Sequence, residues 1–167
     1  YGGKVSLPLV IRTQCGAGLG NGAQHSQSLE AILAHIPGIR IIMPSNAYDA
    51  KGLLLRAIRD NNPVVFIEHK ALYKTKCEVP EEPYECDYTC DVKRPGKNVT
   101  IVTYSAMVNQ SLRAAEKLAE EGVEAEVVDI RTLEPLDTDT IIRSVQKTGR
   151  AVVVHEACRK GGFGAEL

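Results

Sequence analysis

The 167-residue sequence lacks a net charge, a long apolar run and a regular cysteine pattern. It carries 20 basic and 21 acidic side chains, so no net field attracts nucleic acid or an anionic membrane. No stretch approaches the roughly 20 apolar residues that span a bilayer, and no basic-then-apolar start resembles a secretory signal. These absences predict a soluble, intracellular protein whose partners are small molecules and other proteins.

The cysteines also exclude a disulfide framework. There are five, Cys15, Cys77, Cys86, Cys90 and Cys158, an odd number without paired spacing. Cys86 and Cys90 are four positions apart, but no CxxC partner or nearby histidine completes a zinc set. Free thiols fit a reducing compartment.

Apolar runs and helical periodicities alternate over the first 70 residues. We expect buried strands at 7–12, 39–43 and 64–68, because each is a short run rich in β-branched residues between turn-formers. A helix is expected over 47–60, capped by Asn46 or Ser45. This order predicts a parallel sheet.

The same alternation returns after an irregular stretch. Residues 71–98 contain several prolines and no sustained periodicity, so they are expected to be a linker between two domains. Strands are then expected at 99–104, 123–129 and 151–155. One helix is expected after Ser105, with Ser105 as its cap, and another over 137–149. The predicted fold class is α/β, with two parallel-sheet units in tandem.

A glycine-dense loop and the polar segment after it are the most distinctive part of the chain. Glycines at every second position from 16 to 22 let the backbone reach positive φ and approach another surface closely. The segment 25–28 is expected to form the first turn of a helix. The apolar face of that helix is expected to anchor it to a core; its residues are Leu29, Ile32, Leu33 and Ile36.

The loop also allows a dinucleotide-binding interpretation. Residues 18–23, GLGNGA, match the pattern G-x-G-x-x-A. That fingerprint needs a carboxylate about 20 positions on to hold the ribose, and the expected strand there ends Met43-Pro44-Ser45. A nicotinamide-binding oxidoreductase is therefore the weaker alternative, and a conformationally demanding loop at a cleft or interface is favoured.

His25 is the candidate for proton transfer. A helix N-terminus favours the neutral imidazole, which could exchange protons with a substrate that Gln24 and Gln27 orient. The alternative is a helix cap or a solvated side chain. His69 and His155 each end an expected strand, and nothing local decides their role.

Residues 22–73 carry a resemblance to a known family. The stretch GAQHSQSLEAILAHIPGIRIIMPSNAYDAKGLLLRAIRDNNPVVFIEHKALY resembles the β subunit of the thiamine-diphosphate-dependent decarboxylase component of 2-oxo acid dehydrogenase complexes. The resemblance extends over nearly the whole chain. It implies a transketolase-like architecture, with residues 1–70 as the second half of a pyrimidine-binding domain and residues 99–167 as part of a C-terminal domain.

The resemblance also implies an activity and partners. In this family thiamine diphosphate lies between the α and β subunits of an α2β2 tetramer, and the α subunit binds its diphosphate with magnesium. The enzyme decarboxylates a 2-oxo acid and passes the acyl group to lipoamide on the acyltransferase core. Pyruvate is the first expectation for the substrate, with acetoin and branched-chain 2-oxo acids as alternatives. Such enzymes are cytoplasmic in bacteria and lie in the mitochondrial matrix or plastid in eukaryotes.

Individual residues take roles from the resemblance. His25 matches the active-site histidine of the β subunit, and the loop beside the substrate and cofactor is represented by Gly20, Gly22, Gln24, Ser26 and Gln27. The family can also hold a potassium ion through backbone carbonyls and an amide side chain. The matching positions are Leu9, Ala57, Ile58, Asp60 and Asn62.

Part of the family's machinery is expected to be missing. The glutamate that activates the aminopyrimidine lies upstream of Tyr1, and the ends of the chain suggest a piece of a longer protein. The isolated chain is therefore expected to be inactive and to bind thiamine diphosphate negligibly. An alternative of another class is a non-catalytic module that pairs with its α partner or with itself.

Overall fold

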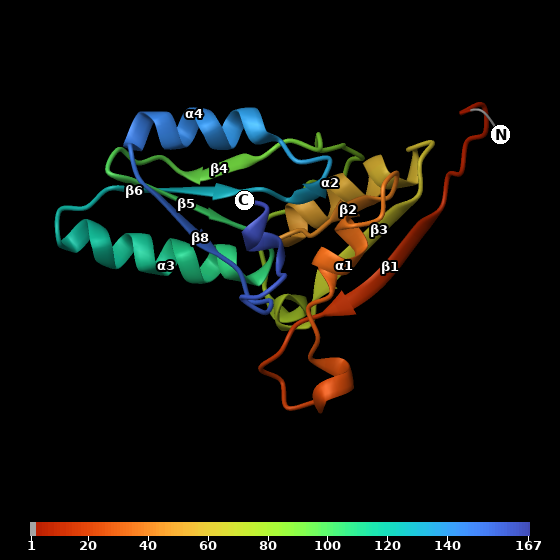
Figure 1. Ribbon diagram of the computed structural model, residues 1–167, viewed down its shortest axis with the longest axis horizontal. Helices are drawn as coiled ribbons and strands as arrows, with labels where there is room; N and C mark the ends of the chain where they lie inside the picture. The colour runs from red at the N-terminus through yellow and green to blue at the C-terminus, as the bar shows by residue number, and fades with distance from the viewer. Residues whose placement is uncertain (1–2) are drawn as a thin grey trace.

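A computed structural model describes residues 3–167 as two four-stranded sheets with helices around them (Figure 1). Tyr1 and Gly2, on which the expectation about the start of the chain rests, lie outside the described residues. No helix in the described part is long and apolar enough to cross a membrane.

The first sheet has the strand order β1-β3-β2-β7. Its first three strands are parallel, as predicted, and β7 joins antiparallel to β2 from the second half of the chain. The elements of this unit are β1 (Val10–Cys15), α1 (Glu30–Ala34), β2 (Arg40–Ile42), α2 (Ala47–Ile58), β3 (Val64–His69) and β7 (Thr132–Glu134). Asn46 caps α2, because its side-chain oxygen accepts a hydrogen bond from the Asp49 amide at 2.8 Å.

The second sheet has the order β4-β6-β5-β8, with β4 antiparallel to β6 and the other pairs parallel. Helices α3 and α4 cover its two opposite faces (Figure 1). The elements are β4 (Asp91–Arg94), β5 (Val99–Thr103), α3 (Ala106–Glu120), β6 (Ala125–Asp129), α4 (Thr138–Thr148) and β8 (Ala151–Val154). Gly149 ends α4 in the left-handed conformation, the usual geometry after a helix.

The two units share one hydrophobic core. Buried side chains from β2 and β3 pack against buried side chains from β5 and from the segments after β6 and β8. These residues are Ile41, Met43, Val65, Ile67, Val102, Tyr104, Ile130, Leu133 and Phe163. Because their burial depends on both units, separating the units would expose the core to water.

A buried ionic cluster crosses the same junction. Asp49 in α2 accepts hydrogen bonds from Arg131 at 2.8 Å and from Lys93 at 2.6 Å. Burial alone would raise the pKa of Asp49, but the hydrogen bonds and charges of Lys93 and Arg131 outweigh burial and lower it. Asp49 is therefore ionised and tied to the second unit.

The irregular stretch contains more structure than expected. Its beginning belongs to a 3₁₀ helix, η2 (Lys70–Lys74), and its end contains β4. The residues between them run over α2, where Lys51 donates to the carbonyls of Glu81 and Glu82 at 3.0 Å. Gly52 lets this segment approach closely, because a Cβ there would lie 2.4 Å from the Cys86 sulfur.

Three local expectations were wrong. The first strand is Val10–Cys15 rather than 7–12, and most of it is exposed because β1 forms an edge of its sheet. Helix α1 spans five residues only, and of its expected apolar face only Leu33 packs against the core, while Leu29, Ile32 and Ile36 are exposed. Ser105 makes no side-chain capping bond to α3.

Candidate functional site

The histidine loop, residues 16–29, connects the end of β1 to α1 and is the orange loop at the bottom of Figure 1. Its base is closed by a hydrogen bond from the Gly16 amide to the Gln27 carbonyl at 3.2 Å. Gly16, Gly18, Gly20 and Gly22 all have positive φ, which confirms the expectation from their spacing. A close approach occurs only at Gly16, where a Cβ would lie 2.1 Å from the Nε2 atom of His69.

His25 lies in this loop, although not where the periodicity placed it. It ends a short 3₁₀ helix, η1 (Ala23–His25), and α1 begins only at Glu30. The expectation that His25 occupies the first turn of α1 was therefore wrong, and the dipole of α1 does not act on His25 as expected. The His25 side chain is exposed and lines a cavity.

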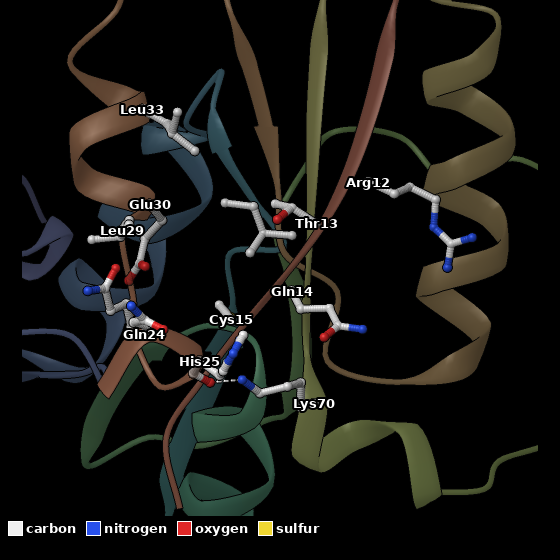
Figure 2. A pocket seen from close by; sticks show the side chains of 12 residues that line it. Arg12, Thr13, Gln14, Cys15, Gln24, His25, Leu29, Glu30, Leu33 and Lys70 are labelled. Carbon is white, nitrogen blue, oxygen red and sulfur yellow. Dashed lines mark hydrogen bonds between the residues drawn. The ribbon is translucent and has the colours of Figure 1, made fainter. Parts of the chain in front are cut away.

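The cavity has a volume of about 610 Å³ and lies between β1, the histidine loop and α1. Figure 2 shows side chains from these elements around it. Its lining comprises Arg12, Thr13, Gln14, Cys15, Gln24, His25, Gln27, Leu29, Glu30, Leu33, Ile67 and Lys70. A cavity of this size, with a few polar groups, is in the range of a small-molecule site.

The structure brings together half of the six loop residues named from the sequence. Gln24, His25 and Gln27 line the cavity, whereas Gly20, Gly22 and Ser26 do not. Instead, the Ser26 hydroxyl donates to the Gly22 carbonyl at 2.7 Å. This bond closes the turn that carries His25, so Ser26 and Gly22 support the position of His25 without lining the cavity.

Lys70 is a site residue that the sequence reasoning missed. It follows β3, lines the cavity, and its ammonium donates a hydrogen bond to the His25 carbonyl (Figure 2). This contact joins the histidine loop to the end of the neighbouring strand and places a cation beside the cavity. Its only signal in the sequence was its position directly after an expected strand.

Glu30 and Cys15 form the buried floor of the cavity. One carboxylate oxygen of Glu30 accepts a hydrogen bond from the Tyr104 hydroxyl at 2.8 Å, and the other has no partner among the described residues. Burial, followed by the charges of Glu30 and Glu156, raises the pKa of the Cys15 thiol to about 12. Cys15 is therefore a protonated packing residue and not a nucleophile.

His69 and His155, left open by the sequence, lie at the ends of β3 and β8, and His69 contacts Gly16 at the base of the histidine loop. The Nδ1 atom of His69 accepts a hydrogen bond from the Ala71 amide at 3.1 Å, so its proton is on Nε2, which donates to Glu156 at 2.5 Å. The ring of His155 stacks on Tyr104 with centroids 6.4 Å apart. Neither histidine lines the cavity.

The residues named for potassium belong to two segments that lie side by side, because the Leu7 amide donates to the Asn61 carbonyl and the Val64 amide to the Leu9 carbonyl. The Leu9 carbonyl accepts a hydrogen bond from Val64, and the Ala57 carbonyl at the end of α2 accepts one from Asp60. The Asp60 carboxylate is already engaged, by Arg40 at 2.6 Å and by the amide side chain of Asn62 at 2.8 Å. Backbone oxygens, that of Ile58 included, and the side-chain oxygen of Asn62 remain to bind a cation here.

Two alternative sites find no support in this geometry. The pattern 18–23 lies in the exposed loop and leads only into the three-residue 3₁₀ helix η1, so it does not open the α-helix whose N-terminus receives the pyrophosphate in that fingerprint. Among residues 3–167 no group of three or more histidine, cysteine, aspartate or glutamate side chains could hold a metal ion.

Two family models together match most of the chain. The model described as transketolase, pyrimidine binding domain matches residues 1–76. The model described as transketolase, C-terminal domain matches residues 89–167. The boundary between them falls in the segment that runs over α2.

The chain is also similar to named proteins of bacteria. It is 54% identical to the β subunit of an acetoin:2,6-dichlorophenolindophenol oxidoreductase of Cupriavidus necator, over 100% of this chain and 50% of that protein. It is 52% identical to the β subunit of the pyruvate dehydrogenase E1 component of Bacillus subtilis, over 99% of this chain and 52% of that protein. The chain thus spans about half the length of these relatives.

A solved structure shows the same arrangement of elements. It is described as a split-gene transketolase in an inactive β4 tetramer, and it matches with a TM-score of 0.81 at 27% identity. The match covers 96% of this chain and 52% of that one. Both units and their relative placement are therefore shared with it.

Proposed function

Because this chain belongs to the transketolase-like family, we propose that it forms half of the β subunit of a thiamine-diphosphate-dependent 2-oxo acid dehydrogenase. The observation that carries the proposal is the position of His25 on the wall of a cavity of about 610 Å³. The chain is 54% identical to the β subunit of an acetoin oxidoreductase and 52% identical to that of a pyruvate dehydrogenase E1 component. In the assembled enzyme the α subunit completes the site and the lipoyl acyltransferase core receives the acyl group.

The residues of the cavity fit the aminopyrimidine side of such a site. Bound thiamine diphosphate would supply the carbanion chemistry that releases carbon dioxide from a 2-oxo acid. The buried oxygen of Glu30 without a partner offers an acceptor for a donor group of a ligand. The side chains of Gln24 and Gln27 orient the substrate, and His25 exchanges protons with the acyl acceptor.

The test separates decarboxylation from acyl transfer. In an α2β2 enzyme whose β subunit carries this sequence, His25→Ala is expected to spare decarboxylation measured with an artificial oxidant more than acyl transfer to lipoamide. His35→Ala is the matched control, because His35 is also exposed and follows α1 on the same segment. Equal loss of both activities in His25→Ala would overturn the role given to His25.

Pyruvate is proposed as the substrate, ahead of acetoin and branched-chain 2-oxo acids. The named relatives act on pyruvate and on acetoin, so both must be compared with a branched-chain 2-oxo acid in the same assembled enzyme. A higher kcat/KM for either alternative would contradict the choice of pyruvate.

The 167-residue chain alone is proposed to have no decarboxylase activity and to bind thiamine diphosphate negligibly. The reason is that in the family the chain resembles, the α subunit binds the diphosphate with magnesium. Calorimetric titration with thiamine diphosphate and magnesium checks this, and a clear binding isotherm would contradict it.

A potassium ion is proposed at backbone carbonyls and the amide side chain of the five positions named from the resemblance, which are Leu9, Ala57, Ile58, Asp60 and Asn62. Carbonyls at a helix C-terminus lack intrahelical partners and suit a hard cation. Thermal unfolding of the assembled enzyme in potassium chloride and in sodium chloride at equal ionic strength tests it. Binding to the folded state predicts a higher Tm in potassium, and equal Tm values would refute the site.

A second candidate function is a non-catalytic interaction module. The exposed apolar side chains of β1, the segment before it and α1 favour this role, as does the solved relative described as an inactive β4 tetramer. These side chains are Val5, Leu7, Leu9, Ile11, Leu29, Ile32 and Ile36. Light scattering of the chain alone, and mixed with an α subunit, tests this, and a monomer in both experiments would exclude it.

A further inference from the structure

The histidine loop is held mainly at its two ends, and the exposed hydrogen bond from Lys70 to the His25 carbonyl is its contact with another element along its length. Residues 17–25 are all exposed, and Gly18, Gly20 and Gly22 have no atoms within 4 Å of where a Cβ would be. Such a segment has little packing of its own to hold it. Contacts at its two ends therefore help to decide where His25 lies, together with the exposed bond from Lys70.

The first end is held by Glu156, which follows β8. One oxygen of its carboxylate accepts a hydrogen bond from the Ala17 amide at 2.7 Å, and the other accepts one from His69 at 2.5 Å. The His69 ring lies directly against Gly16. A single carboxylate from the second unit thus fixes both the first peptide of the loop and the ring beneath it.

The second end is held by Tyr104, which follows β5. Its hydroxyl donates to Glu30, the first residue of α1, at 2.8 Å. The Tyr104 ring is buried, with His155 stacked at 6.4 Å and Phe163 edge-on at 6.2 Å between centroids. The ring is therefore immobilised within the second unit, and through it the end of the histidine loop.

We propose that Glu156 and Tyr104 are positioning residues through which the second unit holds the histidine loop, and His25 with it, at the cavity. Neither side chain lines the cavity, so neither is a catalytic residue. The effect on catalysis rests on the function proposed above for His25. The effect on the loop does not rest on it.

The effect on the loop is measured in the 167-residue chain by amide hydrogen exchange with NMR detection. Glu156→Ala is expected to accelerate exchange at Ala17 and Gly16 by about tenfold or more, the change expected for loss of a hydrogen bond to a charged group. Amides of β5 and β6 should keep their rates. Glu156→Gln retains an acceptor for the Ala17 amide, so it should restore most of the protection there.

Tyr104→Phe tests the second end, because it removes the hydroxyl and keeps the ring. It is expected to accelerate exchange at Gly16, whose partner Gln27 lies three residues before Glu30. The control is Glu166→Gln, since Glu166 is exposed on the same C-terminal segment as Glu156. Unchanged exchange at both Gly16 and Ala17 in Glu156→Ala and Tyr104→Phe would overturn the proposal.

The effect on catalysis is measured in the α2β2 enzyme with a double-mutant cycle. Glu156→Ala should lower acyl transfer to lipoamide by about tenfold or more and oxidant-linked decarboxylation much less. In a His25→Ala background, Glu156→Ala should lower acyl transfer to lipoamide almost no further, because Glu156 acts through His25. Additive losses in the cycle would overturn the positioning role. Faster exchange at Ala17 combined with no selective effect of His25→Ala would instead refute the proposed function and leave the loop contacts established.

Discussion

Asp129 lies at the junction of the two units, and its replacement by asparagine is expected to stabilise the chain more in weakly alkaline than in weakly acidic buffer. The side chain is fully buried at the end of β6. Its carboxylate accepts hydrogen bonds from the Ser45 hydroxyl at 2.5 Å and from the Arg131 amide at 3.1 Å. Lys93 attracts the charged form and Asp49 repels it.

Burial dominates these effects and raises the pKa of Asp129 from 3.8 to about 7. Between pH 3.8 and about pH 7, the folded chain therefore keeps a proton on Asp129 that the unfolded chain has released. The stabilisation of the folded state by this proton is complete below pH 3.8 and is lost as the pH rises through about 7. At about 1.4 kcal/mol per pKa unit, the loss is about 3 kcal/mol between about pH 5 and pH 8.

Asparagine removes this dependence, because it has no proton to lose and still offers an oxygen and an amide to the same partners. Urea unfolding followed by circular dichroism, at several pH values between about 5 and 8, measures the free energy of unfolding. The gain of Asp129→Asn over the parent should grow by about 3 kcal/mol across that range. Asp139→Asn, on the exposed surface of α4, is the control for the loss of a formal charge. A difference between Asp129→Asn and the parent that does not change with pH would refute the reasoning.

Three further changes test other parts of the structure. Gly16→Ala should lower the free energy of unfolding by about 3 kcal/mol or more, because Gly16 has a positive φ and a Cβ there would clash with His69. Gly18→Ala should lower it by only about 1 kcal/mol, the cost of the backbone strain. Equal losses for the two variants in urea unfolding would contradict the close approach at Gly16. Arg131→Met should lower the free energy of unfolding by about 3–5 kcal/mol, because it removes a hydrogen-bond partner from the buried Asp49 carboxylate. A loss of stability under about 1 kcal/mol would show that the pair is hydrated. A thiol reagent should modify the two exposed cysteines quickly and the other three only on unfolding, because burial raises the pKa of those three thiols. Fast modification of a third thiol in the folded chain would contradict this prediction. The exposed pair is Cys77 and Cys158, and the protected three are Cys15, Cys86 and Cys90.

Most regular elements were predictable, because their periodicity was long enough to show. The helix expected over 47–60 is α2, Ala47–Ile58, and the strand expected over 64–68 is β3, Val64–His69. Strands β4 and β7 were missed, since three or four residues carry no pattern of alternation and β4 reads Asp-Val-Lys-Arg.

The errors at β1 and α1 share a physical cause. Periodicity reveals that one face of an element is apolar, but it does not say what covers that face. Ile11 and Ile32 follow the expected patterns and are nevertheless exposed. Conversely, Glu30 is buried where a charged residue is normally solvated, because Tyr104 supplies a hydrogen bond from 74 positions away.

The contacts that support the site could not be derived from spacing, because they join distant segments. Glu156 meets Ala17 across 139 positions. What the sequence did contain was a positional signal: His69 directly ends β3, and Tyr104 and His155 directly follow β5 and β8. Carboxyl ends of parallel strands are where open α/β sheets bind their ligands, and here these ends of both sheets meet beneath the histidine loop. Position at the end of an expected strand, more than residue type, was therefore the property that marked these residues as part of one site.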